Sequence, residues 1–225
     1  QLPKLGSHLD QYFSPPKDNG YYFNVPLQNF VNEFEQTVAN IPDPRLDYTV
    51  GRVGHKWING EDFDPAWSPT GYLQKKHCQP LKEEPIIGDA SLNYVYLRYA
   101  DILLMKAEAL NELGRSSEAV TPLNLVRKRA RESYLHDKGL VGYGSVPVGL
   151  LPDVLLTNQQ SLRDAIRHER RVELGFEFHR YFDLVRYGKQ EAEAALAGTG
   201  FKYSDKQGRF LIPQSEIDTN PSIKE

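Results

Sequence analysis

"LRYADILLMKAEALNELGRSSEAVTPLNLVRKRAR", residues 97–131, predicts two helices joined at Gly114. Apolar residues recur in its first half at three- and four-residue spacing on more than one face, as in a helix buried between neighbours. Gly114 can end that helix in the left-handed conformation, and Ser116 can cap the next one. The short link leaves only an antiparallel pair. Pro122 leaves two alternatives, a kinked second helix or one that begins at Thr121.

The joint between these helices has the residue spacing of a tetratricopeptide turn, with Gly114, Glu118 and Ala119 in the expected places. A single pair of this kind buries its apolar faces only against neighbouring helices. Residues 93–225 are therefore expected to form a mainly α region in which further helices pack on the pair.

The second informative stretch is "LRDAIRHERRVELGFEFHRYFDLVRYGK", residues 162–189. It predicts a helix from Ser161, as cap, to about Val172, a bend at Gly175, and a further helix over 176–187. Large apolar groups alternate with both signs of charge, and charges beside so much apolar surface have to be paired. A structural ion-pair network is predicted, with Arg127 or Arg131 as further partners, among Arg98, Asp101, Glu169, Arg170, Glu173, Arg180, Asp183 and Arg186.

Residues 1–92 are rich in proline and glycine, which indicates a loop-rich region with short strands. One helix is predicted there, over residues 27–39, because Phe30, Phe34 and Val38 recur at four-residue spacing. A small β-hairpin is predicted near the C-terminus, around Asp205–Gly208.

Composition and motifs exclude several classes of function. The chain has 225 residues and a net charge of −3, so bulk electrostatics point to no nucleic acid. "HERRV" lacks the second histidine of a zinc-protease helix, and the single cysteine, Cys78, has no partner of metal-site spacing. No cofactor, no metal and no catalytic residue is expected.

Aromatic side chains in the loop-rich region are the candidates for ligand binding, because sugars stack their C–H faces on such rings. "DNGYYFN", residues 18–24, is the best candidate, since amide groups stand beside two adjacent rings. Any of these rings could instead pin its loop to the core. The predicted ligand-binding residues are Asn19, Tyr21, Tyr22, Asn24, Trp57, Trp67 and Tyr72.

Five stretches, taken in order, resemble the C-terminal half of the SusD/RagB family. They begin with the single stretch "NFVNEFEQ…DPRLDYTVG" (29–51), and continue with "NYVYLRYADILLMKAEALNELG" (93–114) and "LNLVRKRA" (123–130). "LRDAIRHERRVELGFEFHRYFDLVRYGK" (162–189) and "FLIPQSEIDTNP" (210–221) complete the match. Residues 1–92 and 93–225 are then two regions of one longer domain.

The resemblance implies a mainly helical, tetratricopeptide-like fold and a non-catalytic lipoprotein of Bacteroidetes, exposed on the outer-membrane surface. Such proteins bind starch-like glycans or other nutrients and work in nutrient uptake with a SusC-like TonB-dependent transporter. Contact with the membrane is expected only through a lipid anchor on the N-terminal part, since Cys78 does not match the anchor position. The alternative is a tetratricopeptide-type scaffold that binds protein and no small molecule.

Overall fold

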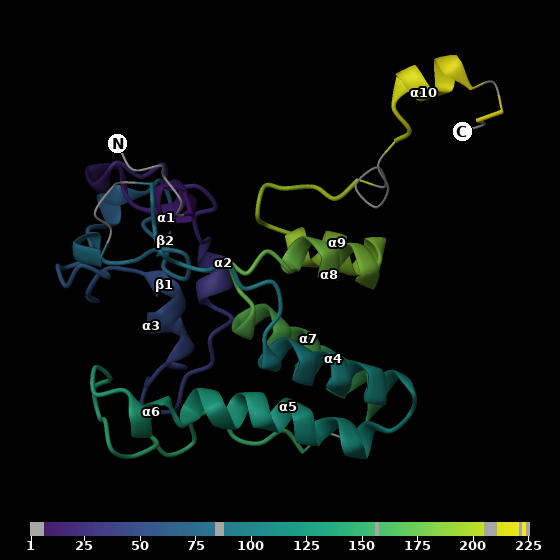
Figure 1. The fold of residues 1–225 in the computed structure, drawn as a ribbon. Coiled ribbons are helices and arrows are strands. Elements are labelled where there is room, and N and C mark those ends of the chain that lie inside the picture. The colour runs from purple at the N-terminus through teal and green to yellow at the C-terminus, as the bar shows by residue number, and fades with distance from the viewer. Residues whose placement is uncertain (1–6, 84–87, 156–157, 205–210, 221, 224–225) are drawn as a thin grey trace. The chain divides into compact units, whose positions relative to one another are not determined.

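A computed structural model describes residues 7–83, 88–155, 158–204, 211–220 and 222–223. The chain divides into two compact units, Gln1–Phe178 and His179–Glu225 (Figure 1). The first unit contains most of both regions predicted from the sequence. Its elements are α1 (Leu9–Phe13), η1 (Pro16–Asp18), α2 (Gln28–Val31), α3 (Arg45–Thr49), β1 (Val50–Gly51), η2 (Pro65–Trp67), β2 (Leu73–Gln74), η3 (Leu81–Glu83), α4 (Tyr99–Glu112), α5 (Ser116–Arg131), α6 (Ser133–His136) and α7 (Gln159–Glu173).

Three helices form the main core of the first unit. Helices α4 and α5 make an antiparallel hairpin, and α7 packs against both (Figure 1). Each helix contributes a leucine with no exposed surface, Leu104, Leu123 and Leu162 respectively. Burying a leucine stabilises the fold by about 1.5–3 kcal/mol relative to leaving it in water.

The hairpin forms where the sequence predicts it. Gly114 has a φ of +75°, its N–H donates to the carbonyl of Asn111 at 3.0 Å, and the next N–H donates to that of Leu110 at 2.9 Å. These two bonds make the Schellman ending, which satisfies carbonyls that a helix end leaves open. Helix α5 begins at Ser116 and its N-cap residue is Arg115, so Ser116 is not the cap. Pro122 lies inside the helix, so the alternative start at Thr121 is wrong.

Two predicted helix boundaries need correction. Helix α7 is capped by Asn158, whose side chain accepts from the N–H of Ser161 at 3.1 Å, so Ser161 is not the cap. After α7, Phe176 and Phe178 both have a φ of 64°, which a right-handed helix does not allow. The next helix therefore begins at Arg180 rather than at Phe176.

The helix predicted over residues 27–39 is much shorter in the structure, where α2 ends at Val31. The chain then turns at Thr37, whose N–H donates to the carbonyl of Ile41 at 2.9 Å and whose hydroxyl accepts from the N–H of Ile41 at 3.0 Å. Val38 is fully exposed at the tip of this turn. The four-residue spacing of apolar residues was a misleading signal here, because only Phe34 of the last two repeats enters a core.

The predicted β-hairpin was placed at the wrong end of the chain. Its turn, 205–208, lies outside the described residues, while residues 201–204 and 211–213 beside it carry no strand. In the described chain the two-stranded antiparallel sheet pairs β1 with β2, with Val50 opposite Gln74. Both strands are buried, so the sheet belongs to the core of the loop-rich region.

The described part of the unit His179–Glu225 contains three helices, of which α8 packs against α9. Leu184 and Ala192 are its buried apolar residues among those described. None of the described helices in either unit is both long enough and apolar enough to cross a bilayer. The elements of this unit are α8 (Arg180–Tyr187), α9 (Lys189–Leu196) and α10 (Gln214–Thr219).

Candidate functional site

Three rings of the loop-rich region form an exposed cluster, which we call the aromatic surface: Tyr12, Tyr21 and Phe23. The ring centroid of Tyr12 lies 6.2 Å from that of Tyr21 and 6.0 Å from that of Phe23, and those of Tyr21 and Phe23 are 5.7 Å apart. The three residues are 40%, 46% and 54% exposed. These mutually packed rings together form a continuous apolar area that is exposed to solvent.

The backbone holds this surface in place. The N–H of Phe23 donates to the carbonyl of Tyr12 at 2.8 Å, and that of Tyr22 donates to the carbonyl of Ser14 at 3.1 Å. The loop therefore lies directly along α1 and the residue that follows it. Gly20 permits this approach, because a Cβ at that position would lie 2.0 Å from the carbonyl oxygen of Ser14.

The sequence predicted Tyr21 and Tyr22 as a pair of binding rings, and the structure separates them. Tyr22 has a φ of 42° and is exposed, but its ring contacts no other ring of the described residues. Asn19 and Asn24, with φ values of 59° and 53°, are exposed on either side, where asparagine tolerates the left-handed conformation. Tyr21 packs instead against Tyr12, which the sequence did not single out.

The remaining predicted binding residues, Trp57, Trp67 and Tyr72, are buried or half-buried and contact other side chains. Trp57 is only 2% exposed and packs against Phe63 and Trp67, so its ring cannot be offered to a ligand. Trp67 is half-buried, with the ammonium of Lys17 4.7 Å from its ring centroid. Tyr72 is half-buried and donates its hydroxyl hydrogen to Gln28 at 2.5 Å. For Trp57, the pinning of a loop to the core is the correct interpretation.

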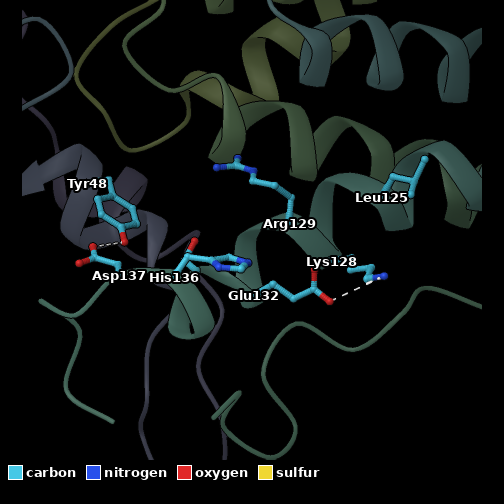
Figure 2. Close-up of a pocket in the computed structure, with 8 residues that line it drawn as sticks. Tyr48, Leu125, Lys128, Arg129, Glu132, His136 and Asp137 are labelled. Atoms are coloured by element: carbon cyan, nitrogen blue, oxygen red, sulfur yellow. Dashed lines mark hydrogen bonds and ion pairs between the residues drawn. The ribbon is translucent and has the colours of Figure 1, made fainter. Parts of the chain in front are cut away.

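A second candidate is a pocket of about 540 Å³ beside α3, α5 and α6 (Figure 2). Most of the residues that line it carry polar groups, and the hydroxyl of Tyr48 donates to Asp137 there. No group of three or more metal-ligating side chains occurs among the described residues. The lining residues are Tyr48, Leu125, Lys128, Arg129, Glu132, Ser133, His136 and Asp137.

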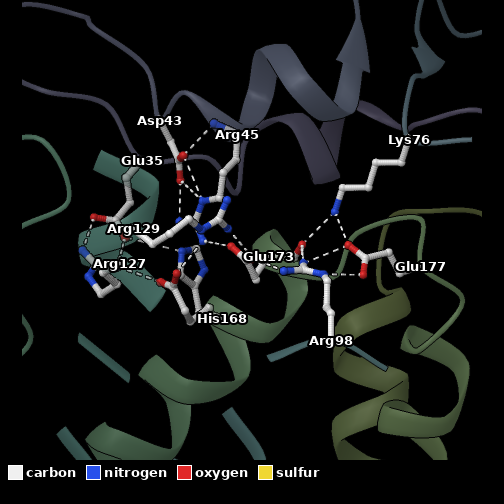
Figure 3. A network of polar contacts seen from close by, with 11 residues as sticks. Glu35, Asp43, Arg45, Lys76, Arg98, Arg127, Arg129, His168, Glu173 and Glu177 are labelled. Atoms are coloured by element: carbon white, nitrogen blue, oxygen red, sulfur yellow. Dashed lines mark hydrogen bonds and ion pairs between the residues drawn. The ribbon is translucent and has the colours of Figure 1, made fainter. Parts of the chain in front are cut away.

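A network of charges centred on buried carboxylates of α7 joins the loop-rich region to the helices (Figure 3). Glu173 on α7 accepts from Arg45 at 2.9 Å, from Arg98 at 2.5 Å and from Arg129. Arg98 also donates to Glu177 at 2.7 Å. Glu173 thus joins α3, α5 and the residue that precedes α4, three places far apart in the sequence.

One turn earlier on α7, Glu169 makes a similar junction. It accepts from Arg45 at 2.5 Å and from Arg127 of α5 at 2.9 Å. Arg127 also donates to Glu35 at 2.6 Å, and Arg45 to Asp43 at 2.6 Å. Arg45 and Asp43 therefore stand at the centre of the network, although the sequence analysis did not name them.

The remaining predicted ion-pair residues lie apart from this junction. Arg170 donates to Asp101 of α4 at 2.7 Å, and both side chains are buried. In the second unit, Asp183 is buried and accepts from Arg186 at 3.0 Å within α8. Arg180 is half-buried at the start of the same helix. The partners on α7 come from other elements rather than from the i, i+3 positions of the same helix.

The pKa values of the network's carboxylates indicate a structural role rather than a catalytic one. Burial would raise the pKa of Glu173, but the guanidiniums of Arg45, Arg129 and Arg98 outweigh it and hold the pKa at about 2. Burial also opposes ionisation of Glu177, yet hydrogen bonds from Arg98 and the charge of Lys76 lower its pKa. Carboxylates kept ionised in this way are poor proton donors and acceptors near neutral pH.

One spacing in the sequence could have located part of the aromatic surface. Tyr21 and Phe23 are two positions apart, a spacing that in an extended segment would place both side chains on one side. Their contact with Tyr12 depends on the loop folding back along α1, which no local pattern encodes. Asp43 and Arg45 are likewise ordinary charged residues in the sequence until α7 is brought to them.

Comparisons with known proteins agree on one family. Residues 6–225 match the model of the SusD family. The chain is 31% identical over 235 residues to SusD-like protein P25 of Formosa agariphila, covering 99% of this chain and 38% of that protein. It is 43% identical over 100 residues to SusD-like protein P2 of the same organism, covering 44% of this chain and 17% of that protein.

Solved structures share the fold. Surface glycan-binding protein A from Bacteroides uniformis is 26% identical with a TM-score of 0.65, covering 97% of this chain and 46% of that one. A SusD superfamily protein from Bacteroides vulgatus is 22% identical with a TM-score of 0.69, covering 94% and 45% respectively. The latter likeness is one of fold alone. The chain spans less than half the length of each of these four relatives.

Proposed function

Since the chain belongs to the SusD family, we propose that it is part of a non-catalytic carbohydrate-binding protein whose ligand contacts include the aromatic surface. The single observation that carries this proposal is the exposed packing of Tyr12, Tyr21 and Phe23. A sugar ring presents C–H groups on its faces, and these can stack on aromatic rings. The binding free energy is more favourable when the rings are already held in position, because less conformational entropy is lost on binding. A related solved structure, 26% identical, bears the name of a surface glycan-binding protein.

Polar groups beside the rings suit a carbohydrate. The side chains of Asn19 and Asn24 are exposed near Tyr21 in the sequence, and an amide both donates to and accepts from hydroxyl groups. Tyr22 lies between them and is exposed. These side chains would fix the orientation of a sugar that the rings hold by stacking.

The wider role proposed for the protein follows from its family. We infer that it works in nutrient uptake with a SusC-like TonB-dependent transporter. We further place it on the outside of the outer membrane, held there by a lipid anchor of the complete protein. Membership of the SusD family supports the expectation that the chain is not an enzyme. An oligosaccharide is the ligand that the aromatic surface favours.

The alternative role is a scaffold that binds only protein, and the outer face of α4 favours it. Tyr99 and Ile102 of this helix, and Leu113 directly after it, are exposed in the tetratricopeptide-like pair. Exposed apolar residues on a helix are typical of contacts with another protein segment. The two roles predict different effects of substitution. A scaffold that binds only protein would keep its binding when the aromatic surface is removed.

Affinity electrophoresis of the protein in gels containing different polysaccharides tests the proposal. We expect at least one polysaccharide to retard the protein, and the double substitution Tyr12→Ala, Tyr21→Ala to abolish the retardation. Tyr143→Ala is the matched control, because Tyr143 is 45% exposed in another loop. Unchanged retardation of the double variant, with native thermal unfolding, would refute the role of the aromatic surface.

A further inference from the structure

The pocket beside α3, α5 and α6 shares no residue with the aromatic surface. It has a volume of about 540 Å³, within the range of about 300–1,000 Å³ that small-ligand pockets occupy. Figure 2 shows Arg129 reaching from α5 toward the side where Tyr48 lies, with His136 between them. The pocket is therefore large enough for a ligand of one or two rings.

Arg129 keeps much of its hydrogen-bonding capacity free. Its Nη2 donates to Glu173, while its Nε and Nη1 donate to none of the residues that the structure describes. A guanidinium has two edges that can grip a carboxylate with two parallel bonds, and each edge uses one hydrogen of Nη2. Because Glu173 takes one of those hydrogens, one complete edge remains available. The side chain of Arg129 is 56% exposed, so this edge is accessible.

The other lining groups add two further donors, Lys128 and His136, beside one open acceptor, the carboxylate of Glu132. The ammonium of Lys128 lies 3.7 Å from the carboxylate of Glu132, which is beyond hydrogen-bonding distance. The ring of His136 has no hydrogen-bond partner in the described part of the chain. By contrast, Asp137 already accepts from Tyr48 and from the N–H of Gly139 at 2.7 Å.

Two apolar surfaces complete the pocket. The ring of Tyr48 and the side chain of Leu125 both line it and are exposed. They can cover the body of a ligand while the charged end meets Arg129. A bare inorganic anion would leave these surfaces without a partner.

We propose that this pocket binds a small organic acid, a carboxylate carried on a ring-sized body, with the carboxylate on the free edge of Arg129 and the body against Tyr48 and Leu125. The proposal is independent of the aromatic surface and of what binds there. Loss of polysaccharide binding and loss of acid binding are therefore separate results.

Titration calorimetry with D-galacturonate and D-galactose tests the proposal, because the two sugars share a ring and differ in the carboxylate. We expect saturable binding of galacturonate, weaker binding of acetate and none of galactose. Arg129→Lys keeps the charge but loses the two-bonded grip, and should weaken galacturonate binding by about tenfold or more.

A second variant keeps the test sharp if Arg129→Lys unfolds the protein. Leu125→Glu adds a carboxylate at an exposed lining position outside the ion-pair network, and should abolish galacturonate binding. Lys138→Gln removes an exposed cation outside the pocket lining and should change nothing. Equal binding of galactose or acetate would overturn the proposal. So would no binding of galacturonate, or binding that both Arg129→Lys and Leu125→Glu leave unchanged.

Discussion

Glu173 illustrates how one carboxylate can hold several elements together. It is 2% exposed and accepts from three arginines, of which Arg129 alone is well exposed. Removing it would take away an anion that the three arginines share, and would leave Arg45 with Asp43 and Glu169 and Arg98 with Glu177. Removing one partner of a buried ion pair is strongly destabilising, because the remaining buried charges lose part of their compensation.

Glu173→Ala is therefore expected to lower the free energy of unfolding by about 3 to 5 kcal/mol. Denaturant unfolding followed by circular dichroism measures this. Glu118→Ala is the control, because Glu118 forms an exposed surface pair with Arg115 and its loss should be within error. Equal stability of the Glu173 variant and the parent would mean that the network contributes little.

The same residue predicts a dependence on pH. The pKa of Glu173 is about 2 in the folded protein, below its ordinary value of 4.5. Between these values the unfolded chain binds a proton that the folded protein does not, so acid favours unfolding. The lowered pKa values of Glu35 and Glu177 act in the same direction.

Stability is thus expected to be complete above about pH 4.5 and to fall steadily toward pH 2. Thermal midpoints measured at several pH values check this. Glu173→Gln has no proton to gain or lose at this position and should show a shallower decline over the same interval. An equally steep decline in that variant would assign the acid sensitivity to other groups.

Local signals account for the elements that were predicted well. The α4–α5 hairpin depends on apolar spacing and on Gly114, both of which lie within a few residues of the joint. Helix α2 was predicted too long because the apolar spacing continues past Val31, whereas Glu35 beyond the helix pairs with Arg127 of α5. Glu35 and Arg127 are 92 positions apart, so their contact cannot be detected from the spacing of apolar residues within one segment.

The join between α2 and the end of α7 gives a further prediction. Phe30 of α2 packs edge-on against Phe34 and Phe176, with ring centroids 5.2 Å apart in each case. A Cβ added at Gly175 would lie 2.4 Å from the ring of Phe30. Glycine at this position is therefore required by packing rather than by backbone conformation.

Gly175→Ala is expected to cost about 1 to 3 kcal/mol of stability through overpacking. Chemical denaturation of both single variants, Gly175→Ala and Phe30→Leu, and of the double variant measures the cost and its origin. A leucine side chain at position 30 is smaller than the phenylalanine and should absorb part of the clash, so the two losses should not add. Strictly additive losses of stability in the double variant would show that the added Cβ does not clash with Phe30.

Burial also differs strongly between helices, which predicts where the protein opens first. Helices α4, α5 and α7 carry residues with no exposed surface, including Leu104, Leu123 and Leu162. Helix α10 has no buried residue. Local opening follows the number of buried apolar contacts that must be broken.

Hydrogen exchange followed by mass spectrometry should therefore find the slowest amides in α4, α5 and α7, exchanging only on global unfolding of their unit. Peptides from α10 should exchange faster than those from α4, α5 and α7. Protection of α10 equal to that of α5 would contradict this order, and would mean that α10 is covered by something outside the described residues.

The pairing of Arg45 with Glu169 also has a consequence in time, because the ribosome makes the chain in order. The two residues are 124 positions apart. At a translation rate of about 5 to 20 residues per second, Glu169 is synthesised roughly 6 to 25 seconds after Arg45. Until then Asp43 is the nearest anion available to it. The early part of the nascent chain is therefore translated first but completes its folding only when α7 arrives.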